Sequence, residues 1–298
     1  MKSHSKPSDA DLNPPPSYTE AIQQNAPPQP QQQQTRSASL GHQQHTHMPA
    51  SSSRRTSAPA THVSRQFPPS FNMYNVSSFM DRRYVLGEHQ DRPLYALSFH
   101  SGFSGQPDLV LHNGPTEDHP VLAAFQRESF SSSAIITLPP PPGCPGTRTG
   151  AEERLEPASS GFGSTTYVFT IETGPGNRRE TFEWRHSRGG AVSQLGGKTS
   201  GWKLVRLATG PPSGLEGPGQ GGGSSSSAAT FVGGGDMSSD GKEVVAAWCW
   251  AVGSITKKLK FQFLGSGRTP GVLGERWAIM AVVSALRIWE HERRQKEN

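Results

Sequence analysis

The chain has 298 residues, a formal net charge of +5 and a hydrophobic content of 32%. Its 33 glycines and 26 prolines together exceed average usage, whereas the apolar content is well below that of a typical globular domain. This composition excludes a uniformly folded protein of this length. No window approaches the roughly 20 consecutive apolar residues that a membrane-spanning helix needs.

The first 66 residues are the least apolar part of the sequence. Their large apolar side chains are Leu12, Tyr18, Ile22, Leu40, Met48 and Val63. Such a segment cannot offset the entropy of ordering its backbone, so we expect residues 1–66 to be a disordered Pro-, Gln- and Ser-rich tail. The tail begins without the apolar core of a secretory signal. We therefore expect a cytoplasmic protein that is not secreted, and leave open a peripheral membrane or nuclear location.

Cysteine and charge usage argue against several classes of function. Two cysteines, Cys144 and Cys249, cannot form a disulfide framework or a zinc cluster, and the histidines show no metal-binding spacing. We expect neither a metal nor a cofactor. The basic residues do not form a concentrated stripe, so we expect no nucleic-acid partner.

Residues 67–298 are predicted to form one domain that carries two low-complexity insertions. The insertion at 139–164 opens with PPPPGCPG, and the insertion at 210–241 is glycine-rich and contains SSSS. Both compositions are typical of long surface loops.

Outside the insertions the domain reads mostly as strands. In 180–186, Phe182 and Trp184 share one face, and in 257–264, Leu259, Phe261 and Phe263 do so. This alternation is typical of antiparallel sheets, and no helical pattern separates the strands, so the sequence predicts a β-barrel or sandwich. The predicted strands are 84–87, 94–100, 108–112, 121–125, 134–138, 166–172, 180–186, 201–207, 243–252 and 257–264.

The C-terminus is the exception, because helix-forming residues run from Glu275 onward without glycine or proline. Its first turns, from Trp277 to Trp289, are apolar on every side. Such a helix belongs inside the protein, yet at about 20 Å its apolar part is too short to cross a bilayer.

Antiparallel strands followed by one apolar terminal helix resemble the tubby C-terminal-like superfamily, which includes tubby proteins, phospholipid scramblases and LURP-one-related proteins. The segments that carry the resemblance are TYVFTIETGPGNRRETFEWRH, GWKLVRL, KEVVAAWCWAV, KKLKFQFLG and LGERWAIMAVVSALRIWEHERR. It implies a closed antiparallel barrel of about 10–12 strands with the C-terminal helix through its centre. A lumen that holds a helix needs small inward residues, so we predict that Ala247, Cys249 and Ala251 face inward.

The tail contains a PPxY sequence, Pro15-Pro16-Ser17-Tyr18. Proline holds this segment near polyproline II, the conformation that WW domains bind in an aromatic groove. Pro15, Pro16 and Tyr18 resemble the docking motif of adaptors for HECT-type ubiquitin ligases. Chance occurrence in a proline-rich tail is the alternative.

Two serines in the tail follow arginines in the manner of kinase sites. Arg54-Arg55-Thr56-Ser57-Ala58-Pro59 would resemble a 14-3-3 ligand once Ser57 is phosphorylated, and Ser39 lies in a weaker copy. The alternative is an ordinary solvated Ser/Arg-rich tail.

No catalytic motif emerges, so we predict a protein that is not an enzyme. Gly196-Gly197-Lys198-Thr199 lacks the first glycine of a phosphate loop and is read as a β-turn. The segment around His186 is read as a strand, although a deep polar pocket there would favour a hydrolase.

Basic residues of the predicted strands could bind a lipid headgroup, as tubby domains bind phosphoinositides. The candidates are Lys203, Arg206, Lys258 and Lys260. Alternatively, these basic residues belong to the solvated faces of the sheet and bind no ligand. We therefore expect a non-catalytic adaptor whose tail docks a WW-domain protein and whose barrel recognises a membrane headgroup or a protein. The alternative is a phosphoinositide-binding or scramblase-like lipid-handling protein with a regulatory tail.

Overall fold

The computed structural model describes residues 66–76, 83–100, 104–128, 133–141, 151–159, 165–213, 231, 233 and 235–297. The predicted fold class is confirmed: twelve antiparallel strands close into a barrel, and neighbours in sequence are neighbours in the sheet. The strand β12 pairs with β1 and closes the barrel. The strands are β1 (Ser70–Asn75), β2 (Tyr84–Gly87), β3 (Tyr95–Phe99), β4 (Leu109–His112), β5 (Val121–Arg127), β6 (Ala134–Leu138), β7 (Ala151–Ser159), β8 (Thr165–Thr173), β9 (Arg178–Ser187), β10 (Gly201–Arg206), β11 (Val244–Trp250) and β12 (Lys257–Phe263).

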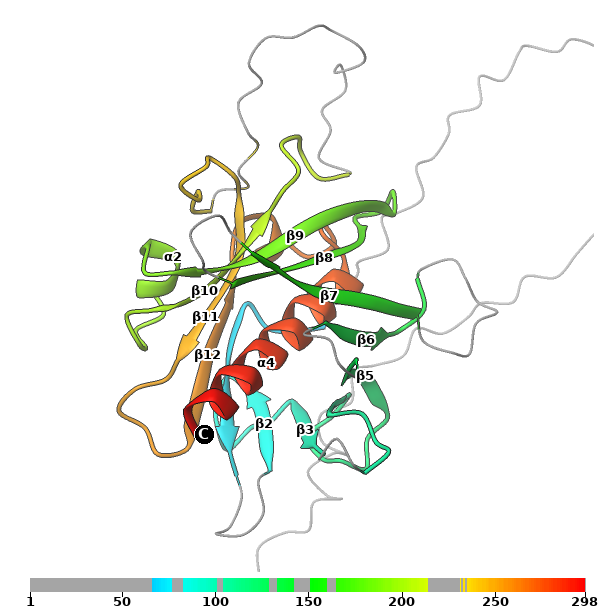
Figure 1. Ribbon diagram of the computed structural model, residues 1–298, viewed down its shortest axis with the longest axis vertical. Helices are drawn as coiled ribbons and strands as arrows, with labels where there is room; N and C mark the ends of the chain where they lie inside the picture. The colour runs from blue at the N-terminus through cyan, green and yellow to red at the C-terminus, as the bar shows by residue number, and fades with distance from the viewer. Residues whose placement is uncertain are drawn as a thin grey trace, which may run out of the picture. The chain divides into compact units, whose positions relative to one another are not determined.

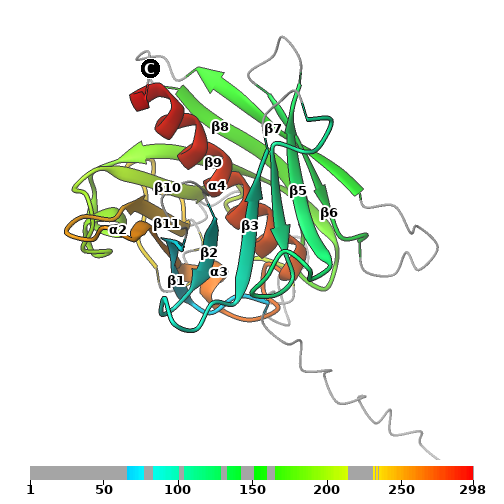
Figure 2. The ribbon, with the colours of Figure 1, turned by 90° about the horizontal axis from the view of Figure 1, so that it is seen from below.

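The helix α4 (Glu275–Glu297) runs through the middle of the barrel (Figure 1). In the view turned by 90°, it lies between β3 and β5 on one side and β8 to β10 on the other (Figure 2). Its buried side chains belong to the same core cluster as the inward residues of the strands. The predicted placement of this helix inside the barrel is therefore confirmed. Among the described residues, no helix is both long enough and apolar enough to cross a membrane.

All ten predicted strands are present, but two further strands were missed. The first, β1, precedes the first predicted strand, and the second, β7, lies inside the predicted insertion at 139–164. The prediction of an insertion was therefore wrong for residues 151–159. There β7 pairs with β6 along its first half and with β8 along its second half.

The predicted orientation of the small residues on β11 is also wrong. Trp248 and Trp250 pack on the core around α4, whereas Ala247 and Cys249 belong to a separate outer cluster. This outer cluster includes Ala191 and Val192 of the short helix α2 (Gly190–Ser193). Small residues are needed on the outside because α2 and the following loop cover β11. A Cβ atom on Gly197 would lie 2.4 Å from the Sγ atom of Cys249.

One polar residue in the middle of α4, Ser284, is hydrogen-bonded inside the barrel. At the centre, the indole Nε1 of Trp184 donates to Ser284 Oγ at 2.8 Å, and both residues are fully buried. A second short helix, α3 (Gly265–Arg268), lies between β12 and α4. Together with the core cluster, the Trp184–Ser284 bond fixes the rotation of α4 about its axis.

We expect Ser284→Ala to lower the free energy of unfolding by about 1–3 kcal/mol, because the indole of Trp184 would lose its hydrogen-bond partner. Chemical denaturation measures the change. Ser193→Ala is the matched control, since Ser193 lies on the surface, where its hydroxyl donates to Gly190 O. Equal stability of the two variants would contradict the prediction.

Candidate functional site

The four predicted lipid contacts occupy different environments. Lys203 lies on the outer face of β10, because Trp202 and Leu204 face the core. Lys258 and Lys260 lie on the outer face of β12 by the same alternation. Arg206 is fully buried, so its prediction as a surface lipid contact was wrong.

The outward lysines differ in how firmly they are held. The ammonium of Lys260 donates to the carbonyls of Leu195 and Gly196 at 2.8 and 2.9 Å, which ties the loop after α2 to the barrel. The ammonium of Lys258 donates to Ile255 O at 2.8 Å within its own hairpin. Partial burial, and then the charge of Arg185, lower the pKa of Lys203. The structure thus places these lysines on the outer sheet without joining them into one binding site.

The loop predicted to be a β-turn rather than a phosphate loop leads directly into a strand. Gly196 has a φ of 62°, and the amide of Lys198 donates to Trp250 O at 2.8 Å. The strand β10 begins at Gly201, so no helix follows the loop to cradle a phosphate.

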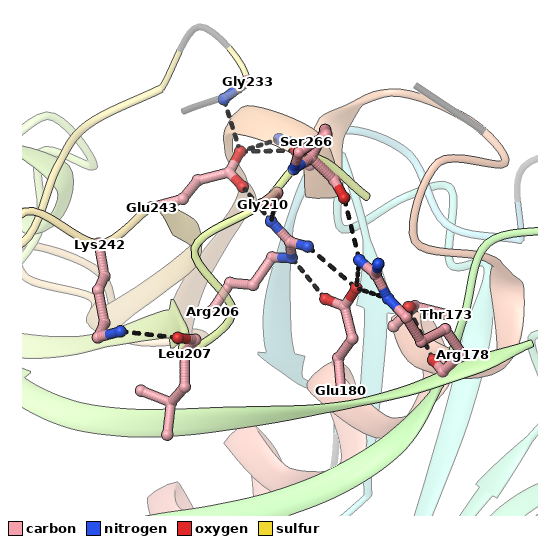
Figure 3. Close-up of polar contacts among 11 residues, drawn as sticks. Thr173, Arg178, Glu180, Arg206, Leu207, Gly210, Gly233, Lys242, Glu243 and Ser266 are labelled. Carbon is pink, nitrogen blue, oxygen red and sulfur yellow. Dashed lines mark hydrogen bonds and ion pairs between the residues drawn. The ribbon is translucent and has the colours of Figure 1, made fainter. Parts of the chain in front are cut away.

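Arg206 belongs instead to a buried charge network at one end of the barrel (Figure 3). Its Nε donates to Glu180 Oε2 at 2.5 Å and its Nη2 to Oε1 at 2.9 Å. Arg178 donates to the same Oε1 at 2.5 Å. Burial acts to raise the pKa of Glu180, but the hydrogen bonds and charges of the two arginines outweigh it and hold that pKa below its ordinary value.

Glu243 continues the network from the other side (Figure 3). Its Oε1 accepts hydrogen bonds from the amides of Gly233 and Ser266 at 2.8 and 2.7 Å, and from Ser266 Oγ at 2.7 Å. Its Oε2 lies 3.8 Å from Arg206 Nη1. Both carboxylates are buried, so this network is positioned to hold the fold together rather than to meet a ligand.

The network anchors both ends of the predicted insertion at 210–241. Arg206 donates to Gly210 O at 2.6 Å and Arg178 to Pro211 O at 3.0 Å on the entering side. On the returning side Glu243 holds Gly233, and Phe231 N donates to Thr209 O at 2.9 Å. The barrel therefore tolerates a long insertion here because its two ends are fixed beside each other.

A polar concavity of about 400 Å³ lies beside the C-terminal end of α4. Glu292 accepts hydrogen bonds from the indoles of Trp202 and Trp250 at 2.8 and 2.6 Å, and the ammonium of Lys296 lies 3.7 Å from the centre of the Trp250 ring. His186 and Ser200 also line this concavity. Within the described part of the chain, His186 makes no hydrogen bond to a hydroxyl or a carboxylate, so the concavity does not assemble a nucleophile, base and orienting acid.

The second concavity, of about 420 Å³, lies where β7 and β8 separate. Their pairing extends from Glu156–Val168 to Ser159–Thr165. Beyond it, Glu153 bridges the opening, because it accepts hydrogen bonds from Arg179 Nη2 at 2.8 Å and Arg276 Nη1 at 3.0 Å. Glu172 bonds the same two arginines. Sequence reasoning missed this concavity because it placed residues 151–159 in an insertion.

The tail residues of the predicted sites, Pro15, Pro16, Tyr18, Ser39 and Ser57, lie outside the described residues. Within the described ranges, no cluster of three or more histidine, cysteine, aspartate or glutamate side chains is arranged to hold a metal ion. The class that the geometry defines is a twelve-stranded antiparallel barrel filled by its C-terminal helix. No family model, no curated protein and no solved structure matches the chain.

Proposed function

We propose that this protein is a non-catalytic adaptor. Its tail docks a WW-domain protein, such as a HECT-type ubiquitin ligase, through Pro15, Pro16 and Tyr18. Its barrel recognises a membrane lipid headgroup or a protein, as the resemblance to the tubby C-terminal-like superfamily implies. Membership of that superfamily is part of the proposal, and the arrangement of barrel and helix supports it.

The observation that carries the proposal is the position of α4. Between Trp277 and Trp289 nearly every side chain of this helix is buried against the inward residues of the barrel. Both concavities described above open to the outside, and the buried side chains of α4 occupy the lumen, where a small substrate would otherwise bind. Recognition on outer surfaces, combined with a docking peptide in the tail, is the function that this division of the chain supports best.

Phosphorylation of Ser57, and more weakly of Ser39, would add a second docking site to the same tail. The phosphate would supply the charge that a 14-3-3 protein binds through its arginines. In this proposal the tail selects partners and the barrel selects the location or target.

We expect Tyr18→Ala in the full chain to abolish binding to a recombinant WW domain, because the tyrosine fills one of the two grooves of such domains. Calorimetry or a pull-down measures this binding, and Ser17→Ala is the matched control, since the motif leaves that position open. If Tyr18→Ala binds as well as the native chain, the adaptor proposal fails.

The alternative is a phosphoinositide-binding or scramblase-like lipid-handling protein with a regulatory tail. The observation that favours it is the outward position of Lys258 and Lys260 on β12. In that case vesicle binding would survive Tyr18→Ala but be lost in Lys258→Ala combined with Lys260→Ala. The control for that pair is circular dichroism, because Lys260 also holds the loop after α2.

A further inference from the structure

Large apolar side chains are exposed at both ends of the barrel, and at one end three of them lie on neighbouring connections. Because the strands alternate in direction, the connections β1–β2, β3–β4, β5–β6, β7–β8, β9–β10 and β11–β12 all leave the barrel at this end. The C-terminal end of α4 lies at the same end, beside the turn between β11 and β12 (Figure 1). We call it the hairpin end.

The turn between β11 and β12 carries the most exposed of these side chains. Ile255 is 91% exposed and Val252 is 55% exposed. Val76, 40% exposed, lies at the neighbouring end of β1, where Asn75 N donates to Thr256 O at 2.8 Å. Single exposed apolar residues are common on protein surfaces, but neighbouring ones at a projecting tip indicate an interaction surface.

Two lysines lie beside this apolar tip. Lys257 and Lys258 begin β12 directly after the turn, and the ammonium of Lys258 is held against Ile255 O. Further basic residues in or beside the connections at the hairpin end are Arg83, Arg188 and Lys198. The connection between β2 and β3, which carries Glu88 and Asp91, also reaches this tip, because Thr256 Oγ1 donates to Gln90 Oε1 at 2.7 Å. The positive charge beside the apolar tip is therefore local, and Lys257 and Lys258 supply it.

The surface argued here consists of Val76, Val252, Ile255, Lys257 and Lys258.

We propose that the hairpin end is a membrane-contact surface: Val252 and Ile255 enter the boundary between headgroups and acyl chains of an anionic bilayer, and Lys257 and Lys258 bind the headgroups around them. This inference rests on the membrane-binding half of the proposed function. An anionic bilayer fits better than a protein partner, because the apolar residues project from a narrow turn instead of lining a groove. Lys257 and Lys258 beside the apolar tip also favour a negatively charged surface.

The test measures partition of the full chain between water and vesicles by flotation. We expect binding to vesicles of phosphatidylcholine mixed with phosphatidylserine, weakened by salt, and little binding to phosphatidylcholine alone. Val252→Ser combined with Ile255→Ser is expected to lower the partition coefficient by about tenfold or more, because the inserted apolar surface is lost. The matched control is Leu94→Ser combined with Val121→Ser, which removes exposed apolar residues from the opposite end of the barrel and should leave binding unchanged.

Insertion has its own readout. Ile255→Trp should bind anionic vesicles at least as well as the native chain and show an added blue-shifted fluorescence component when bound, because the new indole would leave water. The inference would be overturned if the native chain did not bind anionic vesicles. It would also be overturned if the serine double variant bound them as well as the native chain does. Self-association lost in the serine double variant, without vesicle binding, would reassign the surface to a contact between copies and also overturn it.

The outcomes separate this inference from the proposed function. Vesicle binding that needs Lys258 and Lys260 but not Val252 and Ile255 would refute insertion and keep headgroup recognition. The WW-domain measurement on Tyr18→Ala does not involve vesicles, so it tests the proposed docking of the tail separately from membrane binding.

Discussion

A chain that ends at Gly274, before α4, is expected not to form the folded barrel. The truncation removes the apolar side chains that fill the lumen, including Trp277, Met280 and Trp289, each at most 1% exposed. Burying a side chain of this size contributes roughly 1.5–3 kcal/mol, so losing several exceeds the net stability of about 5–15 kcal/mol that a typical domain has. Near-ultraviolet circular dichroism and denaturant titration would show a loss of cooperative unfolding.

The matched control removes only the exposed end of the same helix. A chain without residues 295–298 keeps Glu292, which holds the indoles of Trp202 and Trp250, and should unfold cooperatively. Adding a synthetic peptide of residues 275–298 to the longer truncation should restore part of the native signal. A folded, cooperative barrel that ends at Gly274 would contradict the placement of α4 as the core.

Most of the fold could be predicted because its strands alternate strongly. Strands such as β9 and β12 place aromatic residues inward and charged residues outward, and one buried apolar helix follows them. The missed strand β7, AEERLEPAS, contains a proline and no aromatic or β-branched residue. Of its side chains only Leu155 enters the apolar core, so no period-two signal was available.

The orientation of β11 was wrong for a different reason. Both of its faces are buried, one by α4 and the other by α2, and alternation alone cannot tell two buried faces apart. The assumption that a filled lumen requires small residues failed, because Trp248 and Trp250 pack beside the helix while small residues meet the outer cover.

The buried networks could not be predicted from spacing. Arg276 and Glu153 are 123 positions apart in the sequence, and Arg206 and Glu180 are 26 apart. Arg206 follows Trp202 and Leu204 at alternate positions, so the pattern did place it on the inward face. The prediction as a lipid contact rested on charge alone, and the alternation was the signal that could have corrected it.

Arg206→Leu is expected to lower the free energy of unfolding by about 3–5 kcal/mol, because it leaves buried carboxylates without their partner. Glu180 would keep only the partly exposed Arg178, and Glu243 would lose its nearest cation. Chemical denaturation at neutral pH measures the loss. The matched control is Arg154→Leu, which breaks a surface pair with Glu128 and should cost at most about 1 kcal/mol.

The pH dependence identifies the carboxylate that is responsible. In the native chain the arginines lower the pKa of Glu180, so its stabilising contribution is present above the ordinary carboxyl pKa and is lost as the pH falls through the lowered value. Without Arg206, only Arg178 would counteract the effect of burial on Glu180, so the pKa of Glu180 should rise. The variant then takes up a proton on Glu180 before the native chain does, and the stability difference between them should narrow on acidification. A difference that stays constant from neutral to acidic pH would mean that lost packing, rather than an unpaired charge, destabilises the variant.

Arg206→Leu combined with Glu180→Leu separates these causes further, since it removes the unpaired carboxylate and should be more stable than Arg206→Leu alone.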